Sequence, residues 1–366
     1  MNKKIDKSFF IIILQGENIV NPKKTVYDIN KYPHSSMDRK DKIKLDLNEN
    51  LMGCSLKVIE ALKKITHDDI SGYPDYDNFL TKLSYYLDVS VDNLLITNGA
   101  DDAIKAVMDA YLDKDDEIII PIPTFYLFEL YSTFVGAEKN LIYYNDDLTF
   151  PVEEILEKIN INTKMIVIVN PNNPTGTIVK QEDIERICKK ARNAIVLVDE
   201  AYFQFSQKSS KNLIFNYDNL IIIQTFSKGF GLAGLRLGYI ISNSEVIQNL
   251  NKVVLPYTVN RLSIVAGSAA LDDLNFVNHY VGLVKENRGF LVSELTNLGV
   301  KTYQSDANFI IANFGEKSKH IYEKLSKKDI LVKDVSDQPM LDGCLRIAIG
   351  TKNQMETLVE EIKNIL

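Results

Sequence analysis

The middle of the chain alternates short apolar runs with longer stretches in which apolar residues recur at helical spacing. Such alternation is typical of βαβ units, and uninterrupted apolar runs are typical of parallel strands buried on both faces. We therefore expect an α/β fold whose central sheet is mostly parallel and flanked by helices. The clearest predicted strands are Leu94–Thr97, Glu117–Pro121, Met165–Val169, Ala194–Asp199, Leu220–Thr225 and Gly238–Ser242. The predicted helices between them include Asp101–Leu112, Phe125–Val135 and Gln181–Ala191.

From about residue 266 the pattern changes to a long amphipathic helix followed by alternating strands and helices. This change predicts a large domain over residues 45–265 and a smaller α+β domain over residues 266–366. Residues 1–44 are expected to form an N-terminal arm that belongs to the smaller domain or packs on a partner subunit. The later predicted elements are strands Phe309–Asn313 and Leu345–Ile349, helix Lys319–Lys327 and a closing helix from Asn353 to Leu366.

The apolar run Phe9–Leu14 follows three lysines and superficially resembles a signal peptide. It is too short for one, and no small-residue cleavage site follows it, so an opening strand or packed arm is the better interpretation. No apolar run in the sequence reaches the length of a membrane span. The sequence therefore predicts a cytoplasmic protein that does not bind membranes.

Charge and composition exclude several classes of partner. The 366 residues carry a net charge of −7, which argues against a general nucleic-acid surface. The three cysteines are scattered and the four histidines show no ligand-like spacing, so neither a disulfide framework nor a metal site is expected.

Polar side chains follow three of the predicted strands at the point where each ends. One cluster runs from Asn170 to Gly176, another from Asp199 to Tyr202, and the last ends at Lys228. In open parallel sheets, ligands bind beyond the carboxyl ends of the strands. The three clusters are therefore expected to converge on one site.

Each cluster also has a structural interpretation. An Asn-Pro-rich stretch ending in glycine is often only a tight turn, an Asp-Glu pair after a strand is often a helix cap, and a lone lysine is usually solvated. Asn173, Asp199 and Lys228 nevertheless follow one another at spacings of 26 and 29 residues, each after an apolar strand. Their combination favours a functional site over three coincidences.

Further motifs support a family resemblance. The chain resembles fold-type I pyridoxal-phosphate (PLP) enzymes, and more narrowly the histidinol-phosphate aminotransferase family, over most of residues 44–366. Besides the three clusters, the motifs are Asn48-Glu-Asn50, Tyr73-Pro-Asp75, Asn98-Gly-Ala-Asp101, Pro123-Thr-Phe125, Gly231-Leu-Ala-Gly-Leu-Arg236 and Gly343-Cys-Leu-Arg346.

The chemistry of PLP explains several of these residues. A Schiff base requires a lysine amine whose pKa is lowered by desolvation or nearby cations, and Lys228 fits, with Arg236 as a plausible cationic neighbour. PLP acts as an electron sink only if its pyridine nitrogen stays protonated, a state that Asp199 would favour. By resemblance, Tyr202 and Asn173 hydrogen-bond the phenolic oxygen of the ring.

The cofactor phosphate calls for backbone N–H groups at the start of a helix. Ala100 and Asp101 supply them, and Thr225, Ser227 and Arg236 would complete the site. The resemblance adds Tyr73 from the neighbouring subunit. It also implies that Phe125 stacks on the ring, although a core aromatic is the alternative interpretation.

Arg346 lies within an apolar strand and needs a partner, for which a carboxylate suits its planar guanidinium. The resemblance implies that Arg346 binds the α-carboxylate of the amino donor or the phosphate of the acceptor. A structural ion pair is the alternative. Asn50 and Asn173 are also expected to contact substrate.

The resemblance implies a homodimeric aminotransferase with shared active sites. It would move an amino group from L-glutamate, leaving 2-oxoglutarate, to imidazole acetol phosphate or a smaller relative such as dihydroxyacetone phosphate. The stretch Ile19–Tyr27 lacks the aromatic motif that family members usually carry in the N-terminal arm.

The alternative is a decarboxylase of an O-phospho amino acid, similar to threonine-phosphate decarboxylases, which Gln15–Ile19 faintly resembles. The stretches Ala233–Arg236 and Gly343–Arg346 favour the aminotransferase. A PLP-fold ligand sensor of a transcriptional regulator is disfavoured, because no basic helix-turn-helix segment precedes residue 44.

Overall fold

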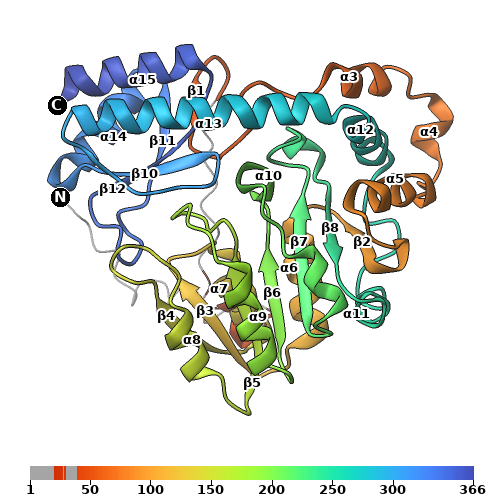
Figure 1. Ribbon diagram of the computed structural model, residues 1–366. Helices are drawn as coiled ribbons and strands as arrows, with labels where there is room; N and C mark the ends of the chain where they lie inside the picture. The colour runs from red at the N-terminus through yellow and green to blue at the C-terminus, as the bar shows by residue number, and fades with distance from the viewer. Residues whose placement is uncertain (1–19, 28, 30–38) are drawn as a thin grey trace. The chain divides into compact units, whose positions relative to one another are not determined.

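The computed structural model describes residues 20–27, 29 and 39–366 (Figure 1). The runs Phe9–Leu14 and Gln15–Ile19 lie outside the described residues. The chain divides into two compact units between residues 35 and 36. In the first unit the described secondary structure is helix α2 (Lys24–Tyr27), and the expected packing of the N-terminal arm stays a prediction.

A seven-stranded sheet forms the centre of the second unit, in the order β2-β8-β7-β6-β5-β3-β4. The five strands from β7 to β4 are parallel, while β8 pairs antiparallel with both β7 and β2. The predicted fold class is confirmed. The strands are β2 (Leu94–Thr97), β3 (Glu117–Ile122), β4 (Glu138–Tyr143), β5 (Thr163–Val169), β6 (Ile195–Asp199), β7 (Leu220–Thr225) and β8 (Gly238–Ile241).

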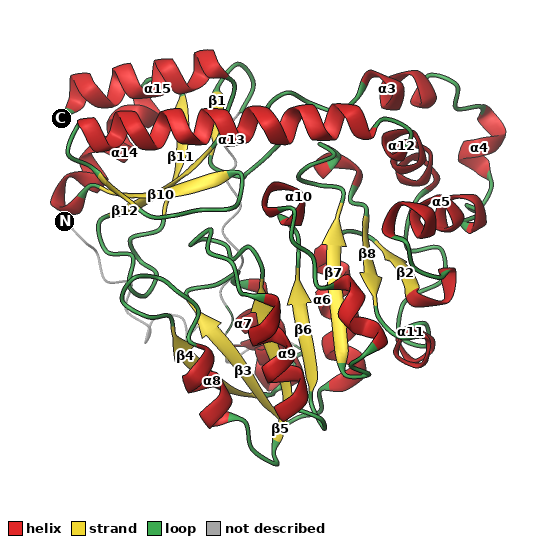
Figure 2. Ribbon diagram, viewed as in Figure 1, coloured by secondary structure: helices red, strands yellow, loops and turns green. Residues whose placement is uncertain are grey.

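Successive side chains of these strands enter two different hydrophobic cores, because a strand alternates its side chains between its faces. In β7, Leu220 and Ile222 join one core, and Ile221 and Ile223 join the other. Helices cover both faces (Figure 2). The Ile221 side is covered by α6 (Ala100–Tyr111), α7 (Leu127–Val135) and α11 (Ser244–Leu250). The Leu220 side is covered by α5 (Asp77–Leu87), α8 (Val152–Lys158), α9 (Gln181–Lys190) and α12 (Arg261–Leu271).

A second, five-stranded sheet has the order β1-β11-β12-β10-β9. Its first strand comes from the beginning of the described unit and pairs in parallel with β11. The strands are β1 (Ile43–Leu45), β9 (Lys301–Thr302), β10 (Phe309–Asn313), β11 (Ile330–Asp334) and β12 (Cys344–Ala348). The helices that pack with them are α13 (Leu274–Asn297), α14 (Ser318–Lys327) and α15 (Lys352–Ile365).

Helix α13 connects the two sheets (Figure 1). It starts after α12, which packs on α3 and α5, and it contacts β9, β10 and α10. Residues 36–366 form one compact unit, so the division at residue 265 stays a prediction. The remaining elements are α3 (Leu56–Leu62), α4 (His67–Ser71), α10 (Phe203–Ser206) and 3₁₀ turns at Val91–Asn93, Lys211–Phe215, Ala233–Leu235 and Gly315–Lys317.

Strands β1, β4, β9 and β11 were not among the predicted elements. Strand β4 lies at an edge of the large sheet, and most of its side chains are exposed, so it has no continuous apolar run. Helix α7 begins at Leu127, two residues later than predicted.

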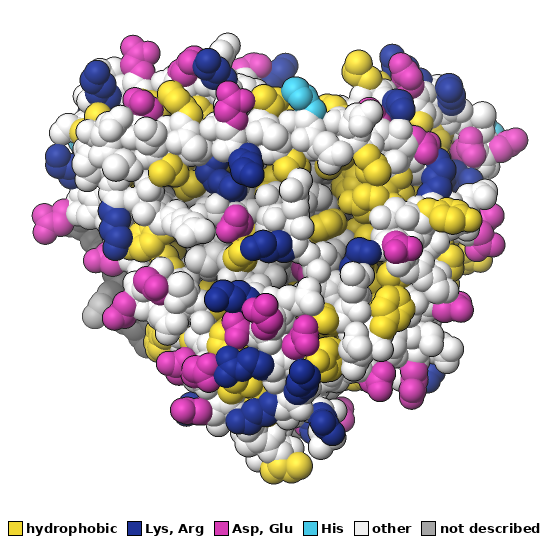
Figure 3. All heavy atoms as spheres, in the orientation of Figure 1, with side chains coloured by type: hydrophobic (Ala, Val, Ile, Leu, Met, Phe, Trp, Pro, Cys, Tyr) yellow, Lys and Arg dark blue, Asp and Glu magenta, His cyan; other side chains and the backbone are white. Residues whose placement is uncertain are grey.

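Among the described residues, no helix is both long and apolar enough to cross a membrane. On the face drawn in Figure 3, acidic and basic side chains are interspersed.

The loop after β5 contacts the loop before β10 at Gly176. The backbone oxygen of Gly176 accepts a hydrogen bond from Asp306 N at 2.8 Å. Gly176 has a φ of +77°, and a Cβ added there would lie 2.2 Å from Ser305 Oγ. Only glycine therefore fits this crossing between the loops of the two sheets.

We predict that Gly176→Ala lowers the free energy of unfolding by about 1–3 kcal/mol, because it adds both a steric clash and left-handed strain. Chemical denaturation would measure the loss. Gly282→Ala is the matched control: Gly282 lies inside α13 with open space around its Cβ position, so this change should stabilise by about 0.5–1 kcal/mol. Equal stability of the two variants would contradict the assigned contact.

Candidate active site

Strand alternation sorts the polar residues at the carboxyl ends of β6 and β7 onto two faces. Asp199 continues the row of Ile195 and Leu197, and Thr225 continues that of Ile221 and Ile223, so both side chains project to the face that α6 covers. Glu200 and Gln224 project to the opposite face. Two separate polar groups therefore arise at one edge of the sheet.

Asp199 is 3% exposed, and its Oδ1 accepts a hydrogen bond from Ala201 N at 2.9 Å. Among the described residues, no cation lies within ion-pair distance of its carboxyl group. Burial, with a smaller contribution from Asp101 and Glu200, raises the pKa of Asp199 to about 7. The hydrogen bond from Ala201 and the charge of Lys228 act in the other direction.

Lys228 lies at the same edge, directly after the buried Ser227. Its Nζ donates a hydrogen bond to Leu47 O at 3.1 Å and lies 5.6 Å from the centroid of the Tyr202 ring. The side chain of Asn50 donates to Gly229 O at 3.2 Å, so the segment around residues 47–50 lies directly against the lysine loop. The structure brings Lys228, Tyr202 and Asn50 together as predicted.

The first turn of α6 faces Arg236. The guanidinium of Arg236 pairs with Asp101 at 2.9 Å and donates to Ser227 Oγ at 3.4 Å. Gly99 precedes the helix with a φ of +87°, and a Cβ added there would lie 2.7 Å from Arg236 Nη2. The backbone and the guanidinium can approach each other only because residue 99 is glycine.

Thr225 and Ser227 complete this group. Ser227 N donates to Thr225 Oγ1 at 3.1 Å, and the two hydroxyls are 3.0 Å apart. Backbone N–H groups of the first helical turn, two hydroxyls and a guanidinium thus surround one position, which is the donor set that a phosphate prefers. Ala100, Asp101, Thr225, Ser227 and Arg236 are all brought together here.

Asn173 and Arg346 meet from opposite sheets. Arg346 Nη1 donates to Asn173 Oδ1 at 2.6 Å, and Arg346 Nη2 donates to Asp46 O. Arg346 is 9% exposed and lies 5.5 Å from the Phe309 ring centroid. Its guanidinium thus donates to an amide oxygen and to a backbone carbonyl oxygen, and the alternative of a structural ion pair stays a prediction.

Phe125 is held beside the loop after β5. Asn172 accepts a hydrogen bond from Thr124 Oγ1 at 2.8 Å and donates to Pro123 O at 2.9 Å, which ties the two loops together. Phe125 is half-buried and meets Phe128 edge to face at 6.4 Å. It contacts the core on one side, and its ring is not enclosed by it.

Tyr73 lies apart from these residues. Its ring is 77% exposed and stacks on Tyr257 with centroids 4.4 Å apart. The neighbouring Thr258 hydroxyl donates to Asp102 at 3.4 Å, in the first turn of α6. Within one chain, Tyr73 therefore reaches the neighbourhood of the phosphate-type site only through Tyr257 and Thr258.

Several buried partners were missed by sequence reasoning. Asn48 donates to Tyr202 Oη at 3.0 Å, and Arg39 pairs with both Asp46 and Glu49. The motif Asn48-Glu-Asn50 drew attention to the segment, but nothing in the sequence connects it with Tyr202. On the opposite face of the sheet, Glu200 accepts from Gln224 Nε2 at 2.7 Å.

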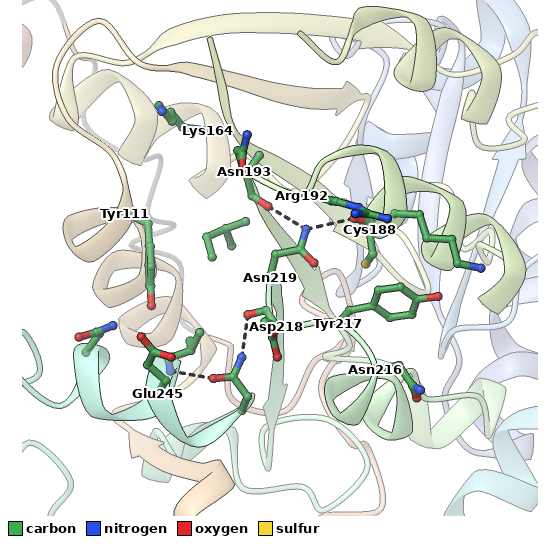
Figure 4. Close-up of a pocket in the computed structure, with 16 residues that line it drawn as sticks. Tyr111, Lys164, Cys188, Arg192, Asn193, Asn216, Tyr217, Asp218, Asn219 and Glu245 are labelled. Carbon is green, nitrogen blue, oxygen red and sulfur yellow. Dashed lines mark hydrogen bonds between the residues drawn. The ribbon is translucent and has the colours of Figure 1, made fainter. Parts of the chain in front are cut away.

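A hollow of about 670 Å³ lies at the other end of the large sheet, where β6 and β7 begin (Figure 4). Its labelled residues include Lys164, Arg192, Asn193 and Glu245. Asn219 bonds the carbonyls of Cys188, Ala191 and Ala194 and so serves the local loop structure. None of the predicted site residues lines this hollow.

The residues at the carboxyl edge fit PLP. A protonated pyridine nitrogen would supply the cation that the buried Asp199 lacks within ion-pair distance. The group around Gly99 and Arg236 would hold the phosphate, and Lys228 would supply the amine. The chemistry of each donor set thus matches one part of the cofactor.

Comparisons with known proteins also indicate a PLP-dependent enzyme. Residues 40–362 match the family model for aminotransferase class I and II. The histidinol-phosphate aminotransferase of Caldanaerobacter subterraneus subsp. tengcongensis is 35% identical over 347 residues, which cover 93% of this chain and 95% of the relative. The enzyme of the same name from Clostridium novyi is 34% identical over 336 residues, covering 90% and 94%.

Among solved structures, histidinol-phosphate aminotransferase from Sinorhizobium meliloti, in complex with pyridoxal-5'-phosphate, aligns with a TM-score of 0.86. The alignment covers 95% of this chain and 99% of that one at 20% identity, so it shows a common fold.

Fold and family together define the chain as a PLP-dependent transaminase of fold type I. Within that class it belongs to the histidinol-phosphate aminotransferase family. The predicted family, enzyme class and cofactor are confirmed. The decarboxylase alternative is not favoured, because these curated relatives are aminotransferases.

The raised pKa of Asp199 predicts a dependence of apoprotein stability on pH. The folded state holds a proton up to about pH 7 that the unfolded chain releases near its ordinary value of 3.8, so stability falls as pH rises through this window. Asp199→Asn removes this loss. It should stabilise the cofactor-free protein by about 2 kcal/mol more at pH 8 than at pH 5.5.

Thermal unfolding at the two pH values measures this difference. Asp146→Asn is the control, because Asp146 is exposed, and its effect on stability should be similar at the two pH values. An equal gain for Asp199→Asn at both pH values would contradict the assigned environment.

Proposed function

We propose that the chain transfers the amino group of L-glutamate to a small phosphorylated 2-oxo compound, as a homodimer with shared active sites. The observation that carries the proposal is the meeting of Lys228, Asp199, Tyr202 and Arg236 at one edge of the large sheet. The choice of substrates rests on the similarity to histidinol-phosphate aminotransferases and on the family resemblance. Glutamate leaves as 2-oxoglutarate, and the ketone becomes the amine.

Bound PLP supplies an electron sink for the negative charge that develops at the substrate Cα. Lys228 is proposed to hold the cofactor covalently and then, once its Nζ is released, to accept the proton from Cα and pass it on. Its position supports this role, because Nζ lies near Tyr202 and donates to a neutral carbonyl oxygen, Leu47 O. A positioned general base contributes roughly 10²–10⁴-fold to such a step.

Asp199 is proposed to keep the pyridine nitrogen protonated, and Tyr202 and Asn173 to hydrogen-bond the phenolic oxygen. The backbone of Ala100 and Asp101, with Thr225, Ser227 and Arg236, would hold the phosphate. Phe125 would cover one face of the ring. The donor sets described above support each assignment by their chemistry.

Arg346 and Asn50 are proposed to bind substrate, with Asn173 between them and the cofactor. Arg346 is buried beside Asn173, and its planar guanidinium suits an anion: the α-carboxylate of the donor or the phosphate of the ketone. Use of one cation for both anions in turn would let a single site serve both halves of the reaction.

The exposure of Tyr73 supports a shared site. A phenol that is 77% exposed and stacked on another exposed ring is suited to reach a partner subunit. We propose that Tyr73 completes the phosphate site of the second subunit.

Lys228→Ala is predicted to abolish transamination, with formation of 2-oxoglutarate from L-glutamate falling by at least roughly 10²–10⁴-fold. In the native protein, L-glutamate alone should bleach the visible absorbance of the lysine–cofactor bond and release 2-oxoglutarate. The control is Lys324→Ala, which removes an exposed lysine on α14. Substantial turnover by Lys228→Ala would refute the assignment.

Two ketones test the acceptor. We predict that kcat/KM for imidazole acetol phosphate exceeds that for dihydroxyacetone phosphate by at least about tenfold, because the larger ketone offers more surface to the pocket. Pyruvate, which lacks the phosphate, is the control and should be poorer than either. Failure of both phosphorylated ketones, with pyruvate accepted, would remove the proposed substrate class.

A further inference from the structure

The segment from Asp46 to Asn50 crosses the site and contacts it with almost every residue. Asp46 O accepts from Arg346, Leu47 O accepts from Lys228, and Asn50 donates to Gly229 O. The strand before this segment, β1, belongs to the five-stranded sheet, whereas Lys228 and Gly229 follow a strand of the seven-stranded sheet. The segment therefore contacts residues of both sheets and fixes their positions relative to each other.

Asn48 is the most deeply buried member of this segment. It is 1% exposed and has a φ of +55°, a conformation that asparagine tolerates better than most residues. Asn308, which is fully buried just before β10, donates to Asn48 O at 3.1 Å. The backbone of Asn48 is thus held from the small-sheet side while its side chain points toward the large sheet.

The amide of Asn48 donates to the hydroxyl oxygen of Tyr202 at 3.0 Å. Tyr202 is 4% exposed, and its ring meets Phe309 edge to face at 5.2 Å. A phenol has one proton to donate and two lone pairs that accept. Because Asn48 occupies a lone pair, the Tyr202 proton turns away from Asn48 and remains available to another acceptor.

We propose that Asn48 is a positioning residue that makes Tyr202 a hydrogen-bond donor toward the phenolic oxygen of the cofactor. The inference rests on the role of Tyr202 in the proposed function. It adds that the direction of the hydrogen bond, and not the presence of the phenol alone, is set by Asn48. Asn48 need not touch substrate or cofactor for this purpose.

The direction of this hydrogen bond has a measurable consequence. Donation to the phenolic oxygen stabilises its negative charge and weakens its support for a proton on the nitrogen that joins Lys228 to the cofactor. Loss of the donation should therefore raise the pH midpoint at which the visible absorbance of that bond titrates. A hydrogen bond to a charged group corresponds to about one pH unit.

The experiment is a pH titration of the visible absorbance of the holoenzyme without substrate. Asn48→Gly removes the amide and still permits a φ of +55°, so it avoids backbone strain. We expect Tyr202→Phe to raise the midpoint by about one pH unit. Asn48→Gly should raise it by part of that amount, because the Tyr202 proton then has no fixed direction. In the double variant the midpoint should equal that of Tyr202→Phe, because Asn48 acts through the hydroxyl.

Two further variants sharpen the result. Asn48→Asp keeps the size of the side chain but accepts the Tyr202 proton when ionised, so it should raise the midpoint more than Asn48→Gly does. Asn193→Ala, in the distant hollow of Figure 4, should titrate like the native protein. Thermal unfolding of each cofactor-free variant shows whether the variant is folded, independently of its absorbance.

The outcomes separate the inference from the proposed function. If Tyr202→Phe leaves the midpoint unchanged, the proposed role of Tyr202 is wrong. The inference is overturned if Tyr202→Phe shifts the midpoint and Asn48→Gly does not. It is also overturned if Asn48→Gly shifts the midpoint as much in the Tyr202→Phe variant as in the native protein. A smaller shift with Asn48→Asp than with Asn48→Gly would overturn the assigned direction of donation.

Discussion

Parallel pairing of β5, β6 and β7 makes their carboxyl ends meet at one edge of the large sheet, and the positions of Asn173, Asp199 and Lys228 depend on this constraint. Because strand side chains alternate, residues one position apart at that edge enter different environments. Asp199 and Thr225 face α6, whereas Glu200 and Gln224 face the opposite core. The pleat of the sheet therefore separates groups that can meet a ligand from groups that bond only to protein.

The neighbouring carboxyl groups of Asp199 and Glu200 illustrate this separation. Both are buried, and burial raises the pKa of each. Glu200 accepts hydrogen bonds from Ser209 Oγ, Ser210 N and Gln224 Nε2, so the protein itself satisfies it. Asp199 has one such bond, from Ala201 N, and is left for an external cation. Desolvation without compensation is costly to the apoprotein, and under the proposed assignment PLP binding would offset that cost.

The site also depends on contacts between residues far apart in the chain. Arg346 and Asp46 are 300 positions apart, and Asn48 is 154 positions from Tyr202. The strand β1 carries the segment 46–50 from the small sheet to the lysine loop, while Gly176 lets the loop after β5 approach the loop before β10. The two sheets are thus joined at the site by short loops whose register is set by individual hydrogen bonds.

The sequence by itself determined the fold class, most strands of the large sheet and the residues with the relevant chemistry, because apolar periodicity and polar residues after strands are local signals. Asn173, Asp199, Tyr202 and Lys228 could be named in this way, and Arg236 was added by the family resemblance. Tertiary structure decided the exposed edge strand β4, whose polar side chains give no apolar run, and the pairing of β1 with β11. It also decided the contacts of Asn48 and Asp46, and which of two adjacent carboxyls receives fewer hydrogen bonds from the protein. Those features depend on which distant groups meet a side chain after folding, and no local pattern encodes such a meeting.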